Sequence, residues 1–327
     1  MVAVGAALRE QLFAPDAWQR LSQSADLVLL DQPGDRAGLA AALGEADILV
    51  TGWGTARLDA ELLAGAPRLS LLAHTGGAVS PYATRAVFDR GVRVTQAGAA
   101  MARPVAEVAL TFTLALLHQV HRFDHALREG APWQVAEDAP ERHQILGCPI
   151  GVIGASRTGR AYIALVRALG AEVTVADPYL GAAEAERLGV RVAGLDELLS
   201  ASRITAVHAP ALAETHHLLG ARELALMPDG AGLVNTARSW LVDEAALLAE
   251  LRAGRLDAAL DVFDAEPLPT DHPFRTLPNA LLTPHKAAAT VEGRFSLGES
   301  TVSEIERHLR GQPLLHAVTR ESLTRVE

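Results

Sequence analysis

The chain of 327 residues contains a single cysteine, Cys148, which excludes an internal disulfide bond. Cys148 directly precedes a short apolar run, where a small buried residue is expected more often than a nucleophile. We therefore interpret Cys148 as a structural residue.

No run rich in Lys and Arg is present, and the formal net charge is −10. This charge argues against a nucleic-acid partner or an anionic membrane partner. No signal peptide is visible at the start of the chain, and no apolar run is expected to be long enough to cross a bilayer. We therefore expect a cytoplasmic protein with no membrane partner. Its length favours two domains, each with its own core.

One stretch combines the signals of a nucleotide-binding unit. An apolar run over residues 149–153 predicts a strand, and Gly154-Ala155-Ser156-Arg157-Thr158-Gly159 follows it directly. Residues 160–169 are amphipathic, and residues 172–176 predict a second strand that ends in Asp177. A strand, a glycine turn, a helix, a strand and a terminal acid in this order are typical of a dinucleotide-binding βαβ unit.

Each residue of this unit has a physical role. Gly154 permits the tight turn, and Gly159 lets the helix pack closely, so that the helix N-terminus can face a pyrophosphate. Asp177 can bond the hydroxyls of an adenosine ribose and would repel a 2′-phosphate, which favours NAD over NADP. Ser156 occupies the position of the middle glycine, and its hydroxyl could bond a phosphate oxygen.

Strands and helices alternate along the rest of the chain, which predicts parallel sheets covered on both faces. Further strands are predicted at residues 26–30, 47–51, 69–74, 92–96, 204–209, 233–238, 258–262 and 280–282. Further helices are predicted at residues 36–43, 59–64, 82–89, 196–199, 243–251 and 295–309, with a polar tail after the last.

A long helix is predicted to begin at Pro104 and to continue past Phe123. It is apolar on several sides, as is expected of a helix buried between domains or against another subunit. His118, His121 and His125 lie at helical spacing along it, but no cysteine or acid cluster completes a metal site. We expect no metal. A polar stretch over residues 137–144 leads from this region to the nucleotide-binding unit.

Three polar residues each follow a predicted strand in the second half of the chain: Arg238, Glu266 and His285. In a parallel sheet their side chains would lie at the same edge as Gly154. A histidine exchanges protons near neutral pH, a carboxylate orients its ring, and an arginine binds a carboxylate. Beside a nicotinamide, this set suits the reduction of a 2-oxo acid. Each residue alone also fits an ordinary surface or loop position.

The first half has no pyrophosphate turn, but Gly76, Gly77 and Ala78 follow a predicted strand end. Their backbone N–H groups could hold a substrate carboxylate. A plain loop is the alternative interpretation of the same residues.

The chain resembles the D-isomer-specific 2-hydroxyacid dehydrogenases over nearly its whole length. The matching segments are Gly154–Gly159 with Asp177-Pro178-Tyr179, His208-Ala209-Pro210 with Thr215, Asn235-Thr236-Ala237-Arg238, Leu260-Asp261-Val262-Phe263 with Glu266-Pro267, and Thr283-Pro284-His285. The resemblance implies an α/β protein with two Rossmann-like or flavodoxin-like parallel-sheet domains. A substrate-binding domain would comprise residues 1–101 and 287–327, with an NAD-binding domain, residues 102–286, inserted into it.

The resemblance also implies a reaction and its residues. An NAD-dependent enzyme would interconvert a small 2-oxo acid and a D-2-hydroxy acid, such as glyoxylate, hydroxypyruvate or a phosphoglycerate-like compound, and would form a homodimer through the helix after Pro104. The catalytic positions are Arg238, Glu266 and His285. The cofactor contacts are Gly154, Ser156, Arg157, Thr158, Gly159, Asp177, Pro178, His208, Pro210, Thr215, Thr236, Ala237, Asp261, His285 and Ala287, with Asp261 on the nicotinamide amide. The substrate contacts are Gly76, Gly77, Ala78, Arg238 and His285.

The chain departs from the family pattern at several places that bear on the substrate. Ser156 and Ser239 replace glycines, and Met101 stands where asparagine is common. An Asp-containing run is missing around residues 79–82, and Lys286 follows His285 in place of an aliphatic residue. Lys286 could pair with an acidic substrate tail or be a solvated charge.

Two other functions fit parts of the sequence. One is an NAD(H)-sensing binding module, similar to a corepressor, that binds the cofactor with little turnover; the complete Arg/Glu/His set argues against it. The other is a formate-type dehydrogenase of the same fold, in which a neutral residue would be expected in place of Glu266.

Overall fold

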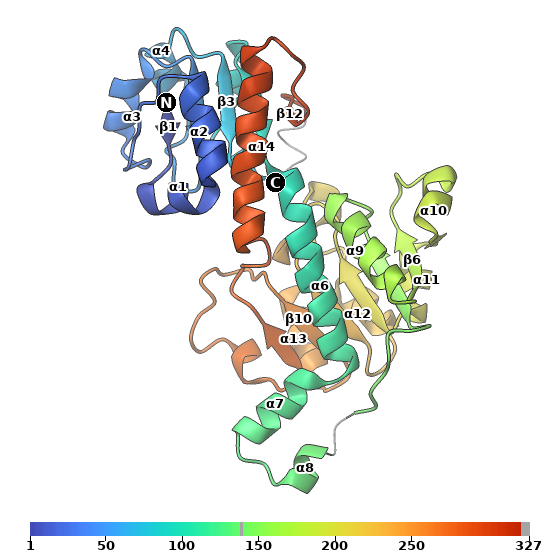
Figure 1. The fold of residues 1–327 in the computed structure, drawn as a ribbon. Helices are drawn as coiled ribbons and strands as arrows, with labels where there is room; N and C mark the ends of the chain where they lie inside the picture. The colour runs from blue at the N-terminus through green and yellow to red at the C-terminus, as the bar shows by residue number, and fades with distance from the viewer. Residues whose placement is uncertain (138–139, 322–327) are drawn as a thin grey trace. The chain divides into compact units, whose positions relative to one another are not determined.

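The computed structural model of the protein describes residues 1–137 and 140–321. The chain divides into two compact units. We call Met1–Met101 together with Ala288–Glu327 the split unit, and Ala102–Ala287 the inserted unit. Figure 1 shows the course of the chain through both. Part of the polar stretch predicted at residues 137–144, and the end of the predicted polar tail, lie outside the described residues.

The split unit contains a five-stranded sheet in the order β1-β2-β3-β4-β12. Its strands are β1 (Val2–Ala3), β2 (Ile48–Thr51), β3 (Leu71–His74), β4 (Arg93–Gln96) and β12 (Ala317–Val318). The first four are parallel, and β12 is antiparallel to β4. The central strand β3 is buried at all four of its residues, because both faces of the sheet are covered.

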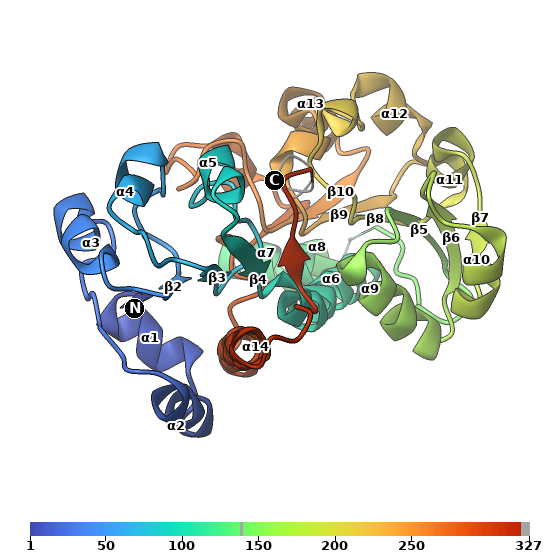
Figure 2. The same cartoon turned by 90° about the horizontal axis from the view of Figure 1, so that it is seen from above.

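Two groups of helices cover this sheet, as Figure 2 shows from above. Helices α3 (Arg36–Leu43), α4 (Ala60–Ala64) and α5 (Arg85–Asp89) contribute to one apolar core. Helices α1 (Ala6–Leu12), α2 (Pro15–Ser24) and α14 (Val291–Leu309) contribute to the other. The C-terminal helix thus completes a unit that the first hundred residues begin.

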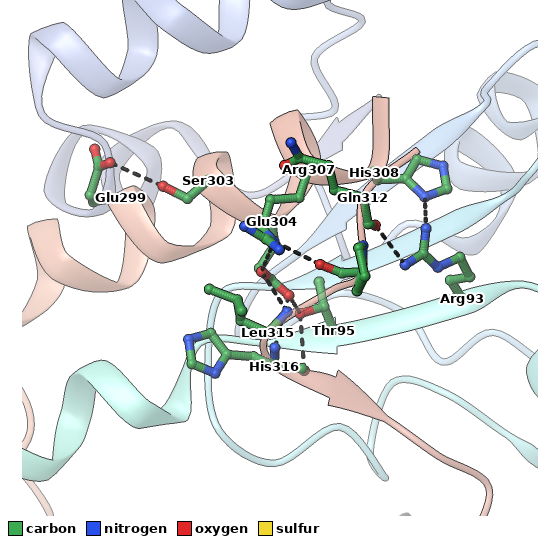
Figure 3. Close-up of polar contacts among 11 residues, drawn as sticks. Arg93, Thr95, Glu299, Ser303, Glu304, Arg307, His308, Gln312, Leu315 and His316 are labelled. Atoms are coloured by element: carbon green, nitrogen blue, oxygen red, sulfur yellow. Dashed lines mark hydrogen bonds and ion pairs between the residues drawn. The ribbon is translucent and has the colours of Figure 1, made fainter. Parts of the chain in front are cut away.

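A buried carboxylate holds the segment before β12 in this unit (Figure 3). Glu304 of α14 is 2% exposed and accepts hydrogen bonds from the Thr95 hydroxyl at 2.9 Å and from the backbone N–H groups of Leu315 and His316 at 3.0 Å each. These bonds hold the segment before β12 against β4. The predicted polar tail includes a short strand, β12.

The inserted unit contains a seven-stranded parallel sheet in the order β11-β10-β9-β8-β5-β6-β7. Its strands are β5 (Pro149–Ile153), β6 (Glu172–Ala176), β7 (Arg191–Val192), β8 (Ile204–Val207), β9 (Gly232–Asn235), β10 (Asp257–Leu260) and β11 (Ala280–Leu282). From β5 the chain adds β6 and β7 on one side of the sheet, and it then returns to add β8 on the other side of β5, so the strand order switches between β5 and β8. Open parallel sheets bind ligands at the carboxyl ends of strands beside such a switch point.

Helices pack on both faces of this sheet as well. Helices α6 (Ala102–Leu117), α9 (Arg157–Ala168) and α10 (Ala182–Leu188) contribute to the apolar core on one face. Helices α11 (Leu195–Ala201), α12 (Ala221–Leu226) and α13 (Glu244–Arg252) contribute to the core on the other. Short 3₁₀ turns lie at η1 (Gly98–Met101), η2 (Ala213–Thr215), η3 (Ser239–Leu241) and η4 (Pro273–Thr276).

The long helix predicted from Pro104 begins earlier and is interrupted. Helix α6 begins at Ala102, and α7 (Val120–Arg128) follows after Gln119, whose backbone has a left-handed conformation with φ 55°. Gln119 donates from its side chain to Leu116 O at 2.9 Å and to Asp257 Oδ2 at 3.0 Å. These bonds compensate for the backbone hydrogen bonds that are lost where the helix breaks. Nothing in the apolar pattern of the sequence indicates this break. A short helix, α8 (Trp133–Glu137), follows α7.

The expectation that no apolar run reaches membrane-spanning length was wrong. The helical stretch Gly98–Leu117 is long and apolar enough by length and composition. Within it, Ala106, Ala109 and Phe112 are buried in the core of the inserted unit. The side of α6 that carries them packs against α9 and the sheet.

Other differences from the predicted elements are local. The predicted strand at residues 26–30 makes only an isolated bridge, Val2 to Leu29, and the helix predicted at residues 82–89 begins at Arg85. The elements α1, α2, α8, α10, α12, β1, β7 and β12 were not predicted. Strands β1 and β12 have two residues each, too few to show a period of their own.

Candidate active site

The turn between β5 and α9 has glycine at the two positions where a side chain would not fit. Gly154 has φ 92°, and a Cβ there would lie 2.6 Å from the backbone N of Ala209. A Cβ on Gly159 would clash with the carbonyl oxygen of Gly154. Both positions therefore depend on glycine, and they bring α9 close to the ends of β5 and β8.

Helix α9 begins at this turn with free backbone N–H groups. Ser156 is its N-cap, and the Ser156 hydroxyl accepts a hydrogen bond from Gly159 N at 3.2 Å. Arg157 and Thr158 are the first helical residues, so their N–H groups have no partner within the helix. Ser156 thus has a structural role that the sequence prediction missed, while its hydroxyl proton stays available to a ligand.

Asp177 lies at the end of β6 and is fixed by two backbone groups. One carboxylate oxygen accepts from Ala155 N at 2.7 Å, and the other accepts from Tyr179 N at 2.8 Å. Each oxygen keeps a further acceptor position, which two adjacent ribose hydroxyls could use. Pro178 is exposed, and it follows Asp177 in the same turn.

Two buried polar atoms beside this edge have no hydrogen-bond partner within the described residues: His208 Nε2 and Thr236 Oγ1. His208 follows β8 and is 3% exposed, and burial lowers its pKa to about 3, so its ring is neutral. Thr236 follows β9 and is 7% exposed. Buried polar groups normally find a partner, so these two atoms fit a bound ligand.

The loop after β8 is held in one conformation by its threonine. Thr215 Oγ1 donates to Pro210 O at 2.7 Å and accepts from Leu212 N at 2.8 Å. Trp240 donates from its indole nitrogen to Leu212 O at 2.8 Å, which ties this loop to the segment after β9. The sequence prediction included Pro210 and Thr215 but missed Trp240.

Arg238 lies in a short turn after β9. The Asn235 side chain donates to Arg238 O at 2.9 Å and accepts from Ala237 N at 3.0 Å, which shapes the turn. Arg238 is exposed, and no ion pair to it is found in the described part of the chain. Its guanidinium charge is therefore available to an anionic substrate.

His285 and Glu266 form a pair after the last two strands. His285 Nδ1 lies 2.6 Å from Glu266 Oε2, and Glu266 Oε1 accepts from Phe263 N at 3.0 Å. A carboxylate can only accept, so the shared proton belongs to Nδ1 and leaves Nε2 to exchange a proton with a ligand. His285 has a left-handed backbone with φ 52°.

Asp261 holds the loop that carries His285. It is 1% exposed and accepts from the Thr283 hydroxyl at 2.5 Å, from Lys286 N at 2.9 Å and from Ala287 N at 2.9 Å. Two of these bonds reach Oδ1 and one reaches Oδ2, so one acceptor position remains for the nicotinamide amide assigned to Asp261 by resemblance. Its contact with the loop is an additional role that was not predicted.

The predicted substrate loop is in the split unit. Gly76 follows β3, and a Cβ there would lie 2.7 Å from His74 Nε2. Gly77 lies close to Met101, whose sulfur would be 3.6 Å from a Cβ. His74 is 1% exposed and receives or donates a 3.0 Å hydrogen bond with Thr51. Burial lowers its pKa to about 4.

The structure thus brings most of the predicted site residues to one edge of one sheet. The ends of β5, β6, β8, β9, β10 and β11 lie at this edge, because all of these strands are parallel. Gly76, Gly77 and Ala78 belong to the other unit. His118, His121 and His125 do not converge, and no group of three potential metal ligands occurs within residues 1–137 and 140–321.

Comparisons with known proteins point to one family. The model of the D-isomer specific 2-hydroxyacid dehydrogenase NAD-binding domain matches residues 110–287. A D-3-phosphoglycerate dehydrogenase from Mycobacterium bovis is 36% identical over 306 residues, which are 93% of this chain and 57% of that protein. A glyoxylate reductase from Aeropyrum pernix is 32% identical over 314 residues, 94% of this chain and 93% of that protein.

A solved structure agrees with these relatives. That of a phosphoglycerate oxidoreductase from Rhizobium etli matches with a TM-score of 0.76 at 30% identity and covers 95% of both chains. The present chain spans little more than half of the mycobacterial protein but nearly all of the glyoxylate reductase.

The glycine turn, the capped helix, the fixed acid and the unpartnered buried atoms define a dinucleotide-binding protein. More specifically, the chain belongs to the family of D-isomer specific 2-hydroxyacid dehydrogenases. The resemblance seen in the sequence and the α/β fold class with parallel sheets are confirmed. NAD is the cofactor of the inserted unit, and the residues at its sheet edge fit that molecule.

Proposed function

We propose that the protein is an NAD-dependent oxidoreductase that interconverts a 2-oxo acid and a D-2-hydroxy acid. The observation that supports this most is the His285–Glu266 pair, 2.6 Å apart at the same sheet edge as the glycine turn. An acid–base histidine at that edge is what the reduction of a carbonyl group requires.

The chain's residues divide the remaining tasks. Arg238 binds the substrate carboxylate. Gly76, Gly77 and Ala78 are substrate contacts by resemblance to the family, through their backbone N–H groups. NADH, when bound, supplies the hydride that C2 of the oxo acid receives. His285 gives a proton from Nε2 to the carbonyl oxygen, which becomes the hydroxyl of the product. Glu266 orients the imidazole and stabilises its charge while the proton is exchanged.

The cofactor residues have matching tasks in this proposal. Ser156, Arg157 and Thr158 at the start of α9 receive the pyrophosphate, and Asp177 receives the ribose hydroxyls. His208, Pro210, Thr215, Thr236, Ala237, Asp261 and Ala287 complete the contacts. Relatives that act on phosphoglycerate and glyoxylate support a small 2-oxo acid as substrate.

A homodimer is part of the proposal. Val120 and Leu127 are 55% and 48% exposed, and their spacing of seven places them on one side of α7. Trp133 and Val135 of α8 are 64% and 62% exposed. Such a group of exposed apolar side chains is expected at a contact with another subunit. We place the protein in the cytoplasm.

An NAD(H)-sensing module without turnover is the second candidate. The two candidates differ in one measurement: oxidation of NADH and NADPH by the purified protein with a panel of 2-oxo acids. We expect turnover with NADH well above that with NADPH, because Asp177 would repel a 2′-phosphate. Tight NADH binding without reduction of any acid in a broad panel would favour the sensing module. Light scattering on the same sample is expected to give twice the mass of one chain.

A further inference from the structure

A cavity of about 610 Å³ lies beside the His285–Glu266 pair within the inserted unit. Both residues line it, together with segments that follow β10 and β11. Its volume falls within the range of about 300–1,000 Å³ that is usual for small-molecule sites. A two- or three-carbon acid would fill only a small part of it, so the cavity has room for a longer substrate.

Most of the cavity wall is hydrocarbon. Phe263, Leu268 and Leu282 contribute apolar side chains, and Pro267 and Pro284 contribute rings. Phe263 is only 6% exposed, so its ring forms a fixed part of the wall. A chain of methylene groups would leave water on entering this space, which favours its binding.

One cation, Arg275, also lines the cavity. Its Nε donates to Pro269 O at 2.7 Å, and one terminal nitrogen donates to Leu268 O at 2.8 Å. These bonds hold the guanidinium in place, and its other terminal nitrogen has no hydrogen-bond partner among residues 1–137 and 140–321. No ion pair to Arg275 occurs in the part of the chain that the structure describes. A guanidinium fixed in this way loses little freedom when it binds a carboxylate.

We propose that this cavity binds the tail of the substrate, and that the tail is an apolar chain ending in a second carboxylate, which Arg275 binds. The substrate class is therefore a 2-oxo dicarboxylic acid. This inference rests on the proposed function, because it places the reacting carbonyl group at His285. It adds a recognition site that neither Arg238 nor the Gly76–Ala78 loop provides.

The experiment compares acids of matched chain length with NADH. The pairs are 2-oxoglutarate with 2-oxopentanoate and 2-oxoadipate with 2-oxohexanoate, and pyruvate serves as the short reference. In the wild-type protein, each dicarboxylate is expected to have a kcat/KM about tenfold or more above its monocarboxylate partner, as one charge-assisted hydrogen bond allows.

Arg275→Gln is expected to remove this preference. The KM for the dicarboxylates rises about tenfold or more, while the values for the monocarboxylates stay nearly unchanged. Arg275→Lys keeps the charge and is expected to recover part of the preference. Unchanged activity with monocarboxylates shows that each variant is folded. Leu268→Trp narrows the cavity and is expected to lower kcat/KM for the six-carbon acids more than for pyruvate.

Lys286→Gln is the matched control. It removes one positive charge next to His285 in the sequence, yet Lys286 does not line the cavity. Its ratio of dicarboxylate to monocarboxylate activity is expected to equal that of the wild type. If Lys286→Gln and Arg275→Gln lose the preference for dicarboxylates equally, the effect is a general one of charge and the proposal is overturned.

Other results would overturn it as well. One is an unchanged ratio in Arg275→Gln, and another is a change in oligomeric state without a change in KM, which would make the cavity a subunit contact. Turnover of pyruvate and monocarboxylates without any preference would remove the cavity proposal and leave the proposed function standing. A failure to reduce every 2-oxo acid would remove both.

Discussion

The position of a single proton decides what His285 can do. Because Glu266 binds Nδ1 at 2.6 Å, the ring presents Nε2 as the atom that exchanges a proton with substrate. Asp261 contributes at a distance, since its three hydrogen bonds shape the 283–287 loop that carries this ring. The chemistry of one side chain thus depends on two carboxylates with different neighbours.

At this scale we predict that His285→Ala binds NADH as the wild type does but loses about 10²–10⁴ in kcat, as the loss of a general acid does. The alanine removes the proton donor. Stopped-flow or steady-state kinetics with the best 2-oxo acid measures the loss, and fluorescence titration measures NADH binding. A kcat near that of the wild type would exclude His285 from the mechanism.

Among the elements, those with a local sequence signal could be predicted. The β5–α9–β6 unit follows from its glycines, its apolar runs and Asp177, and helix α3 has the predicted bounds. Gln119 could not be predicted as a helix break, because its left-handed backbone depends on a bond to Asp257, which is 138 residues away in the sequence. Contacts of this range leave no local pattern.

The site residues that could be predicted also have a local signal in the sequence, and those that were missed depend on how distant segments fold. His285, Glu266 and Arg238 stand at strand ends, where a parallel sheet places them at one edge. The cavity with Arg275 depends on how the segments after β10 and β11 fold back, and residue type alone does not show this. Likewise, the carboxylate of Asp261 could be assigned to the site, but its bonds to Lys286 and Ala287 could not.

For the C-terminal element we predict that Glu304→Ala lowers the free energy of unfolding by about 2–4 kcal/mol, because three donors would lose a buried charged acceptor. Urea denaturation measures the change, and hydrogen exchange at residues 315–318 should quicken. Glu299→Ala on the same helix is the control, since Glu299 is half exposed in its pair with Arg20 and should cost less than about 1 kcal/mol. Equal effects of the two substitutions would contradict this role of Glu304.

For the whole molecule we predict a loss of stability in acid that begins below pH 6.5. Burial lowers the pKa of His74 in the split unit to about 4 and that of His208 in the inserted unit to about 3. The folded state therefore binds fewer protons than the unfolded state below pH 6.5, and stability falls as the pH falls toward the folded pKa values. Each histidine contributes a slope of about 1.4 kcal/mol per pH unit.

Denaturant unfolding at several pH values between 7.5 and about 4.5 tests this slope. His74→Gln should flatten the pH dependence of the split unit, whatever its effect on stability at neutral pH. If the free energy of unfolding of the wild type stays constant from pH 7 to about 5, burial does not lower the pKa of either histidine.

The split unit has a consequence for synthesis on the ribosome. A growing chain that has released residues 1–101 possesses four of the five strands of that sheet but lacks α14 and β12. The inserted unit is continuous in sequence, so all of it is synthesised before α14 and β12 of the split unit. Translation therefore supplies every part of the cofactor-binding unit before it supplies the last parts of the unit that surrounds it in sequence.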